Sequence, residues 1–113
     1  MQLYVELWKP RATWLALSRE KRQEYCTQVA IAIEQLIAQG IELVGFALND
    51  SDTPHRASYG FVAVWKMPNV DLVAKLEQAV EDSHFHEYFE QVNARGELVT
   101  ADAVLSRMVT SPQ

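Results

Sequence analysis

The chain has 113 residues, of which 49% are hydrophobic and 22% charged, a composition typical of a folded domain that excludes a disordered tail, a collagen-like repeat and a coiled-coil rod. Fifteen acidic against ten basic residues give a net charge of −5, so the electric field of the protein repels a phosphate backbone and we expect no nucleic-acid partner. The length suits one domain over residues 1–113, and three features predict a cytoplasmic protein outside the membrane: a single Cys26, no leader segment, and no apolar run of about 18–20 residues.

The first part of the chain predicts a strand, a long helix and a second strand. Side chains alternate over 3–8 as in a strand, and a connection with an apolar cluster follows over 11–17. Ser18 is placed to cap a helix over about 18–39, where apolar residues recur at spacings of three and four. Gly40 ends this helix, because glycine adopts the left-handed conformation easily. Branched and aromatic residues then predict a strand over 41–48.

The middle of the chain predicts a loop, a strand and a second helix. The polar run over 49–56 is rich in short side chains that favour turns. The apolar run over 59–67 stops at Pro68 and predicts a strand that is covered on both faces. Asn69 or Asp71 then caps the second helix. The apolar stripe of this helix consists of Val70, Val73, Leu76, Ala79 and Val80.

The last part of the chain predicts shorter elements. A helical turn over 84–88 leads into a strand over 89–95, which Gly96 closes. A final short helix begins at Thr100 or Asp102. The resulting order of strands and helices, βαββαβ, is that of ferredoxin-like domains. We therefore expect an α+β fold with a four-stranded antiparallel sheet, two helices on one face and an added C-terminal helix.

The sheet face away from the helices is apolar in either register, so it needs a cover. If Leu3, Val5 and Leu7 face the helices, the open face carries Tyr4, Glu6, Trp8, Tyr59, Phe61, Ala63 and Trp65. In the inverted register, Val62 and Val64 lie on the open face instead. Since twofold pairing is the commonest closed assembly, we expect a homodimer in which two sheets pack face to face.

Five stretches carry a resemblance to known proteins: Tyr4-Val5-Glu6-Leu7-Trp8-Lys9-Pro10, Trp14-Leu15-x-Leu17-Ser18, Asn49-Asp50-x-Asp52-Thr53-Pro54-His55-Arg56, Trp65-Lys66-Met67-Pro68 and Tyr88-Phe89-Glu90-Gln91-Val92-Asn93-Ala94-Arg95-Gly96. With the element order, they resemble the dimeric α/β-barrel superfamily, and within it a small family of uncharacterised bacterial proteins. The resemblance spans nearly the whole chain and implies two ferredoxin-like subunits packed sheet to sheet. That superfamily includes heme enzymes, cofactor-free monooxygenases, muconolactone isomerases, YCII-related proteins and stress-response dimers, so the resemblance implies no single activity.

The loop over 49–56 collects polar side chains that are suited to binding or catalysis: Asn49, Asp50, Asp52, His55 and Arg56. One interpretation is a turn, in which the two aspartates bond their own backbone and Pro54 bends the chain. The other is a site in which His55 is a general acid or base oriented by an aspartate, while Arg56 binds a substrate carboxylate.

A second candidate is an aromatic pocket between the sheet and the helices or at the dimer seam. It is lined by Tyr4, Trp8, Tyr59, Trp65, Asn93 and Arg95. Alternation also places the Glu6 carboxylate on an apolar sheet face, which is costly for an unpaired charge. We expect Glu6 either to pair with Arg95 or Arg56 or to have a perturbed proton affinity that suits catalysis. Aromatic residues that only fill the dimer interface are the alternative interpretation.

The segment His84-x-His86-Glu87 contains residue types that bind metals. Histidines two residues apart on a helix point in different directions, so the spacing favours solvated histidines beside a buried Phe85. The same histidines could ligate a heme, but nothing in their spacing selects one. We therefore predict no metal and no cofactor.

Together these patterns predict a homodimer that binds a small molecule. As an enzyme, it would use cofactor-independent acid/base or monooxygenase-like chemistry with His55, Asp52 and Glu6 as catalytic residues. The alternative is a non-catalytic binding or interaction dimer whose polar loop is structural. A buried pair of His55 and an aspartate facing a cavity favours the enzyme, whereas an exposed loop favours the binding protein.

Overall fold

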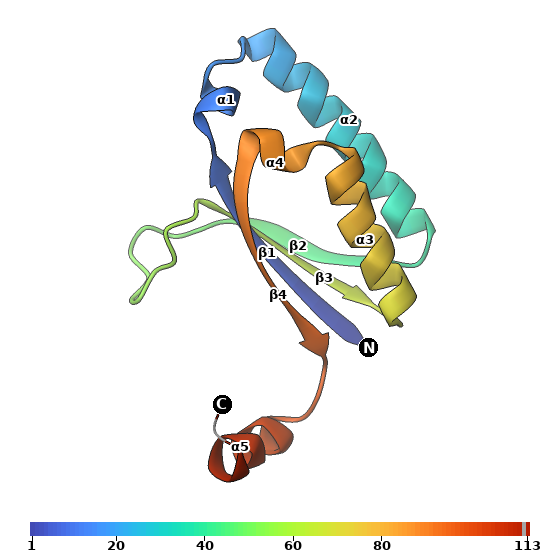
Figure 1. Ribbon diagram of the computed structural model, residues 1–113, viewed down its shortest axis with the longest axis vertical. Helices are drawn as coiled ribbons and strands as arrows, with labels where there is room; N and C mark the ends of the chain where they lie inside the picture. Colours follow the sequence, from blue (N-terminus) through green and yellow to red (C-terminus); the bar gives the residue numbers. More distant parts are fainter. Residues whose placement is uncertain (112) are drawn as a thin grey trace.

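The structure, a computed structural model, describes residues 1–111 and 113 (Figure 1). Its sheet has four strands in the order β2-β3-β1-β4, and all three strand pairs are antiparallel. This confirms the ferredoxin-like α+β fold that the sequence predicts. In chain order the elements are β1 (Gln2–Pro10), α1 (Ala12–Leu15), α2 (Arg19–Ala38), β2 (Glu42–Leu48), β3 (Phe61–Met67), α3 (Val70–Asp82), α4 (Phe85–Tyr88), β4 (Phe89–Glu97) and α5 (Ala101–Thr110).

The helix boundaries follow from short-range signals in the sequence. The Ser18 side chain accepts a hydrogen bond from the backbone N–H of Lys21 at the start of α2, and Gly40 after its end has a φ of +100°. At the start of α3 the cap is Asn69, and at the start of α5 it is Thr100. The aspartates that were the alternative caps lie in the first turn of each helix, where a negative charge suits the helix dipole.

Two predicted boundaries were wrong. The connection over 11–17 contains the short helix α1, which is anchored by tertiary hydrogen bonds: Arg11 Nε donates to the His86 carbonyl and Thr13 Oγ1 to the Glu87 carbonyl. The fourth strand also continues past Gly96, because this residue pairs with Leu3 inside the β1·β4 ladder.

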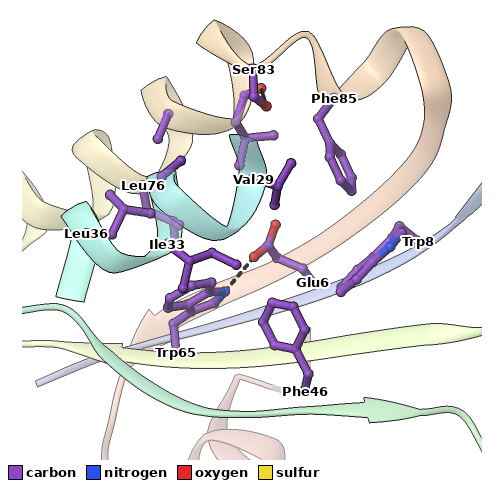
Figure 2. Close-up of a pocket in the computed structure, with 13 residues that line it drawn as sticks. Glu6, Trp8, Val29, Ile33, Leu36, Phe46, Trp65, Leu76, Ser83 and Phe85 are labelled. Atoms are coloured by element: carbon purple, nitrogen blue, oxygen red, sulfur yellow. Dashed lines mark hydrogen bonds between the residues drawn. The ribbon is translucent and has the colours of Figure 1, made fainter. Parts of the chain in front are cut away.

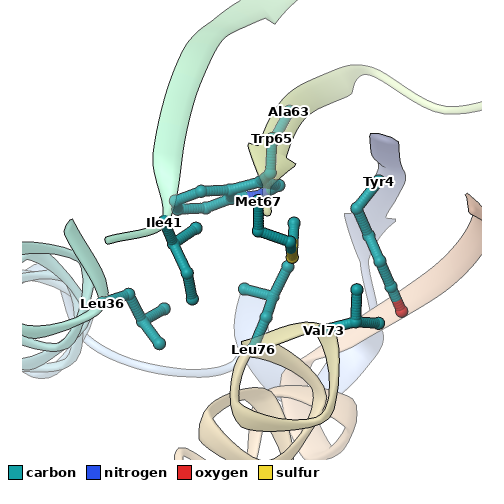
Figure 3. Packing of buried hydrophobic residues seen from close by; sticks show 8 residues of the cluster. All are labelled: Tyr4, Leu36, Ile41, Ala63, Trp65, Met67, Val73 and Leu76. Atoms are coloured by element: carbon teal, nitrogen blue, oxygen red, sulfur yellow. The ribbon is translucent and has the colours of Figure 1, made fainter. Parts of the chain in front are cut away.

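The core lies between the sheet and the helices α2 and α3, which lie side by side over one face of it (Figures 1 and 3). Tyr4 is paired with Trp65 and Glu6 with Ala63, so these side chains share the helix-covered face. The inverted register is therefore the correct one. The buried hydrophobic cluster consists of Tyr4, Leu36, Ile41, Ala63, Trp65, Met67, Val73 and Leu76.

The opposite face of the sheet carries a row of aliphatic side chains that we call the open face: Leu3, Val5, Leu7, Val62, Val64 and Val92. Most of them are partly exposed, and Val92 is exposed to 42%. The sequence predicts that the strand over 59–67 is covered on both faces. The helices α2 and α3 cover only the face opposite the open face.

The C-terminal helix α5 extends beyond the end of β4 (Figure 1). None of its residues is buried, and Val109 is exposed to 82%. The radius of gyration of 16.1 Å reflects this arm, since a compact domain of this length has roughly 13 Å. Over the described part of the chain, no helix has the length and apolar character needed to cross a membrane.

Candidate functional site

A cavity of about 80 Å³ lies between the helices and the sheet, beneath α2 and α3 (Figure 2). We call it the Glu6 cavity, because the Glu6 carboxylate points into it from β1 among side chains that are otherwise almost all apolar. Its walls are formed by Glu6, Trp8, Val29, Ala32, Ile33, Leu36, Phe46, Trp65, Leu76, Ala79, Val80, Ser83 and Phe85.

Local sequence patterns explain how each wall forms. On α2 the apolar spacing of three and four places Val29, Ile33 and Leu36 on the side of the helix that faces the sheet. Alternation along β1 sends Glu6 and Trp8 to the same face as Tyr4. The cavity is therefore the part of the space between layers that the apolar stripe of α2 leaves unfilled.

Glu6 is the chemically distinctive group of this cavity. Its side chain is 6% exposed, and Trp65 Nε1 donates a hydrogen bond to Glu6 Oε1 over 2.5 Å, while Gln91 Nε2 donates to Glu6 Oε2. Burial raises the pKa of this carboxyl, and the two hydrogen bonds and the nearby His86 act in the opposite direction. A buried carboxyl with a raised pKa is a candidate group for proton transfer.

A polar groove of about 370 Å³ adjoins the Glu6 cavity and shares Glu6 with it. In this groove the Tyr4 hydroxyl donates to Glu77 Oε2 over 3.0 Å, and Arg95 Nε lies 3.4 Å from the same oxygen. Burial, followed by the hydrogen bond to Glu77, raises the pKa of Tyr4. Tyr4 is therefore held as a neutral hydrogen-bond donor beside the carboxylate.

The aromatic pocket predicted from the sequence is only partly assembled. Trp8, Trp65 and Glu6 line the Glu6 cavity, whereas Tyr4 and Asn93 line the polar groove. Tyr59 lies apart from both lining sets and has Lys9 Nζ above its ring at 5.0 Å.

The predicted pairing of Glu6 with Arg95 or Arg56 was wrong. Arg95 pairs with Glu77, and the Arg56 guanidinium lies in the loop, so neutral Trp65 and Gln91 donors hold Glu6 instead. The other alternative, a perturbed proton affinity, agrees with the raised pKa. Phe46 and Phe85 also line the cavity, although the sequence did not single them out as site residues. Alternation along β2 is the signal that places Phe46 there, since it pairs with Ala63.

The loop over 49–60 projects away from the helices (Figure 1), and its polar residues bond one another's backbone. The Arg56 guanidinium donates to the carbonyls of Asn49, Asp50, Ala57 and Tyr59. Asp50 Oδ1 accepts from the Asp52 N–H over 2.8 Å, as in an Asx turn. His55 is exposed, with a φ of 55°. None of these residues lines the Glu6 cavity, and the exposed loop favours the structural interpretation.

Arg56→Ala is expected to loosen this loop, because four carbonyl contacts of one guanidinium are lost. The free energy of unfolding should fall by only about 1 kcal/mol, since the contacts are exposed to solvent. Limited proteolysis should cut the variant within 49–60 several times faster than the wild type. His55→Ala, on the same loop, should be cut at the wild-type rate; equal rates for both variants would contradict a structural role for Arg56.

The two histidines of the third predicted motif have different surroundings. His84 is exposed, with a φ of 56°, and its Nδ1 lies 3.9 Å from Glu87 Oε1. His86 Nε2 lies 2.6 Å from Gln91 Oε1, and its Nδ1 lies 3.3 Å from Glu81 Oε1. Phe85 between them is only half-buried. Within residues 1–111 and 113, no group of three His, Cys, Asp or Glu side chains is placed to hold a metal ion.

Comparisons with known proteins agree with the fold. A protein-family model described as a family of unknown function matches residues 1–111. The crystal structure of "Putative Chlorite dismutase TA0507" has a TM-score of 0.65 and 14% sequence identity, covering 93% of this chain and 47% of that one. This chain therefore spans about half the length of that protein, and the likeness shows the fold alone. No curated protein matches the sequence.

Proposed function

The chain belongs to the family of unknown function DUF6616, and from the geometry of its site we propose that the Glu6 cavity binds a small aromatic molecule carrying one hydrogen-bond donor. The observation that carries this proposal is a buried carboxylate, held only by neutral donors, that points into an apolar, aromatic-lined space (Figure 2). Ligand sites commonly combine apolar walls with a few polar groups that fix orientation.

Three properties of the cavity define the ligand. The volume of about 80 Å³ limits the ligand to one small ring at most. The rings of Trp8, Phe46 and Phe85 offer stacking and edge contacts to another aromatic ring. The Glu6 carboxylate attracts an O–H or N–H donor and repels an anion, because no Lys or Arg lines the cavity over the described residues. A phenol or enol therefore fits better than a benzoate or a phosphate ester.

Proton transfer is the chemistry that this arrangement supports. Ionised Glu6 takes the proton of the bound O–H group, which leaves a phenolate or enolate and a neutral carboxyl. The apolar walls favour the neutral carboxyl, and the Trp65 N–H steadies the carboxylate before transfer. Cofactor-independent isomerases and monooxygenases occur in the superfamily that the sequence resembles, and a base in an apolar cavity suits either class.

Two further parts of the proposal concern assembly and the loop. We propose that residues 1–113 act as one domain of a cytoplasmic homodimer whose open faces pack together, since a contiguous aliphatic face of this kind is typical of an interface.

The loop residues His55 and Asp52 were predicted as catalytic. Their exposure and their distance from the cavity lining favour a non-catalytic role for the loop, whichever function the cavity has.

Ligand-observed ¹⁹F NMR tests the proposal with three probes of similar size: 4-fluorophenol, fluorobenzene and 4-fluorobenzoate. We expect 4-fluorophenol to bind most tightly, fluorobenzene more weakly, and 4-fluorobenzoate weakest of all. In Glu6→Gln the affinity for 4-fluorophenol should fall about tenfold or more, the worth of a hydrogen bond to a charged group. The affinity for fluorobenzene should stay unchanged, because the shape of the cavity is kept.

The matched control for this experiment is His55→Ala, which alters the loop and leaves the cavity intact. It should bind all three probes as the wild type does. Equal affinity of the wild type for 4-fluorophenol and fluorobenzene would show that Glu6 does not select a donor. If His55→Ala lost binding and Glu6→Gln did not, the ligand would bind at the loop and not in the Glu6 cavity.

A further inference from the structure

Glu6 is linked to the protein surface by a row of hydrogen-bonding side chains. Gln91 on β4 uses both ends of its amide: Nε2 donates to Glu6 Oε2, and Oε1 lies 2.6 Å from His86 Nε2 on α4. The other ring nitrogen of His86 lies 3.3 Å from Glu81 Oε1 on α3. With an acceptor facing each of its nitrogens, the imidazole satisfies both contacts when it carries two protons.

The direction of the Gln91 amide follows from its two neighbours. The His86 N–H can be satisfied only by the amide oxygen, and the Glu6 carboxylate only by the amide nitrogen. If the amide turned over, oxygen would face carboxylate and NH₂ would face N–H, so both contacts would be lost. Glu6 and the His86 N–H therefore fix the direction of the Gln91 amide together.

The backbone of α4 explains why His86 and not His84 takes this position. His84 adopts the left-handed conformation before α4, and its side chain faces Glu87. Two residues later His86 faces the start of β4, where Gln91 is paired with Trp8. The motif that the sequence could not assign thus contains two histidines with separate surroundings, one of which contacts the site.

The titratable and charged groups around Glu6 come from every element that borders it on the groove side. They are the neutral Tyr4 hydroxyl on β1, Glu77 and Glu81 on α3, His86 on α4 and Arg95 on β4. Of these, the charge of His86 favours ionised Glu6, whereas Arg95 is paired with Glu77. The α2 residues of the cavity wall are apolar. His86 itself faces Glu81, and its backbone carbonyl accepts from Arg11.

We infer that His86 and Gln91 are positioning residues, which hold the Glu6 carboxylate aimed into the cavity. This inference rests on Glu6 being the working group of the proposed function. It adds a dependence on a surface histidine: without the His86 contact, the Gln91 amide is held on one side only and no longer fixes the Glu6 carboxylate. Binding of a phenol should therefore respond to the loss of His86 as well as to the loss of Glu6.

The test is a ¹³C NMR titration of the Glu6 side-chain carboxyl in the full chain without ligand. His86→Ala should move the midpoint of this titration to higher pH, because a favourable charge and the orientation of Gln91 are lost. Gln91→Leu should move it in the same direction. His84→Ala is the matched control, equally close in sequence and exposed, and it should titrate as the wild type does. Two-dimensional backbone NMR spectra confirm that each variant keeps its fold.

The binding of 4-fluorophenol at pH 7 gives a second readout. His86→Ala should weaken it roughly 2–5-fold, because Gln91 loses a hydrogen bond that orients its amide, and His86→Lys should restore part of the loss by returning a donor near Gln91 Oε1. If the Glu6 midpoint is the same in His86→Ala and the wild type, the inference is wrong even where the probe binds. If the midpoint moves but no probe binds to any form, the inference stands and the proposed function fails.

Discussion

Glu6→Gln is expected to make the protein more stable at pH 8, although the substitution removes the group that we propose as its working residue. The wild-type Glu6 is 6% exposed and is held by two neutral donors, so its ionised form is costly to bury. A glutamine has nearly the same shape and avoids the cost of burying a charge, but its NH₂ group faces one of the two donors, so one hydrogen bond is lost. The free energy of unfolding should rise by about 1 kcal/mol, since the cost of burying an unpaired charge exceeds the roughly 1 kcal/mol of the lost hydrogen bond.

The pH dependence of this effect has a definite sign. Burial raises the pKa of Glu6 in the folded protein above the value of 4.5 expected for the unfolded chain. Below pH 4.5 the carboxyl is protonated in both states, and the wild type keeps its full stability relative to the variant. As the pH rises through the folded-state pKa, the folded protein must release a proton that it holds more tightly, so stability is lost. The advantage of Glu6→Gln should therefore grow from acid to pH 8.

Urea unfolding at pH 5, 6.5 and 8, followed by circular dichroism, measures this difference. Glu90→Gln is the control, because Glu90 is half-exposed and forms a surface ion pair with Lys9. That substitution should change stability by less than about 0.5 kcal/mol at each pH. A Glu6→Gln variant that is less stable than the wild type at pH 8 would mean that the two hydrogen bonds outweigh the cost of burial.

Val64→Lys is expected to dissociate the proposed homodimer without unfolding the subunit. Val64 pairs with Val5 in the middle of the open face, where both side chains are partly exposed in the single chain. In a face-to-face dimer a lysine at this point would bury a charge near the twofold axis, which costs about 2–4 kcal/mol and raises the dimer Kd roughly 100-fold. In the separate subunit the ammonium group reaches water.

Sedimentation equilibrium across a range of concentrations measures this effect, with circular dichroism as the check on folding. Ile31→Lys is the matched control, because Ile31 on α2 is 51% exposed and lies outside the open face. It should leave the wild-type mass unchanged. A wild type that sediments as a monomer at all concentrations would exclude the open face as the interface between two copies.

Local signals in the sequence were sufficient for the framework of the fold. Ser18, Gly40 and Asn69 mark helix ends through contacts within a few residues, and each acts as predicted. The covered face of the sheet could not be chosen in the same way, because both faces of β1 and β3 are largely apolar. Only the packing of α2 and α3 decides it.

The site was predictable to the extent that it lies on regular strands. Glu6 was noticed because alternation puts a charge on an apolar face, and its neighbours Trp8 and Trp65 follow from the same alternation. The roles of Gln91 and His86 depend on the turn between α4 and β4, whose geometry comes from tertiary contacts. The sequence left the loop open between a turn and a catalytic site, since the same polar residue types serve turns and catalysis alike.

The position of β1 in the sheet also determines when the protein can fold. This strand pairs with β3 on one side and with β4 on the other, so that Tyr4 meets both Trp65 and Arg95. During synthesis on the ribosome, β1 emerges before β3 and β4, the two strands with which it pairs. Pairing between strands so far apart in the sequence gives a high contact order, which slows folding. A nascent chain stopped before β4 leaves one edge of β1 without its partner strand and open to other chains. Premature release of this protein should therefore yield fragments that aggregate.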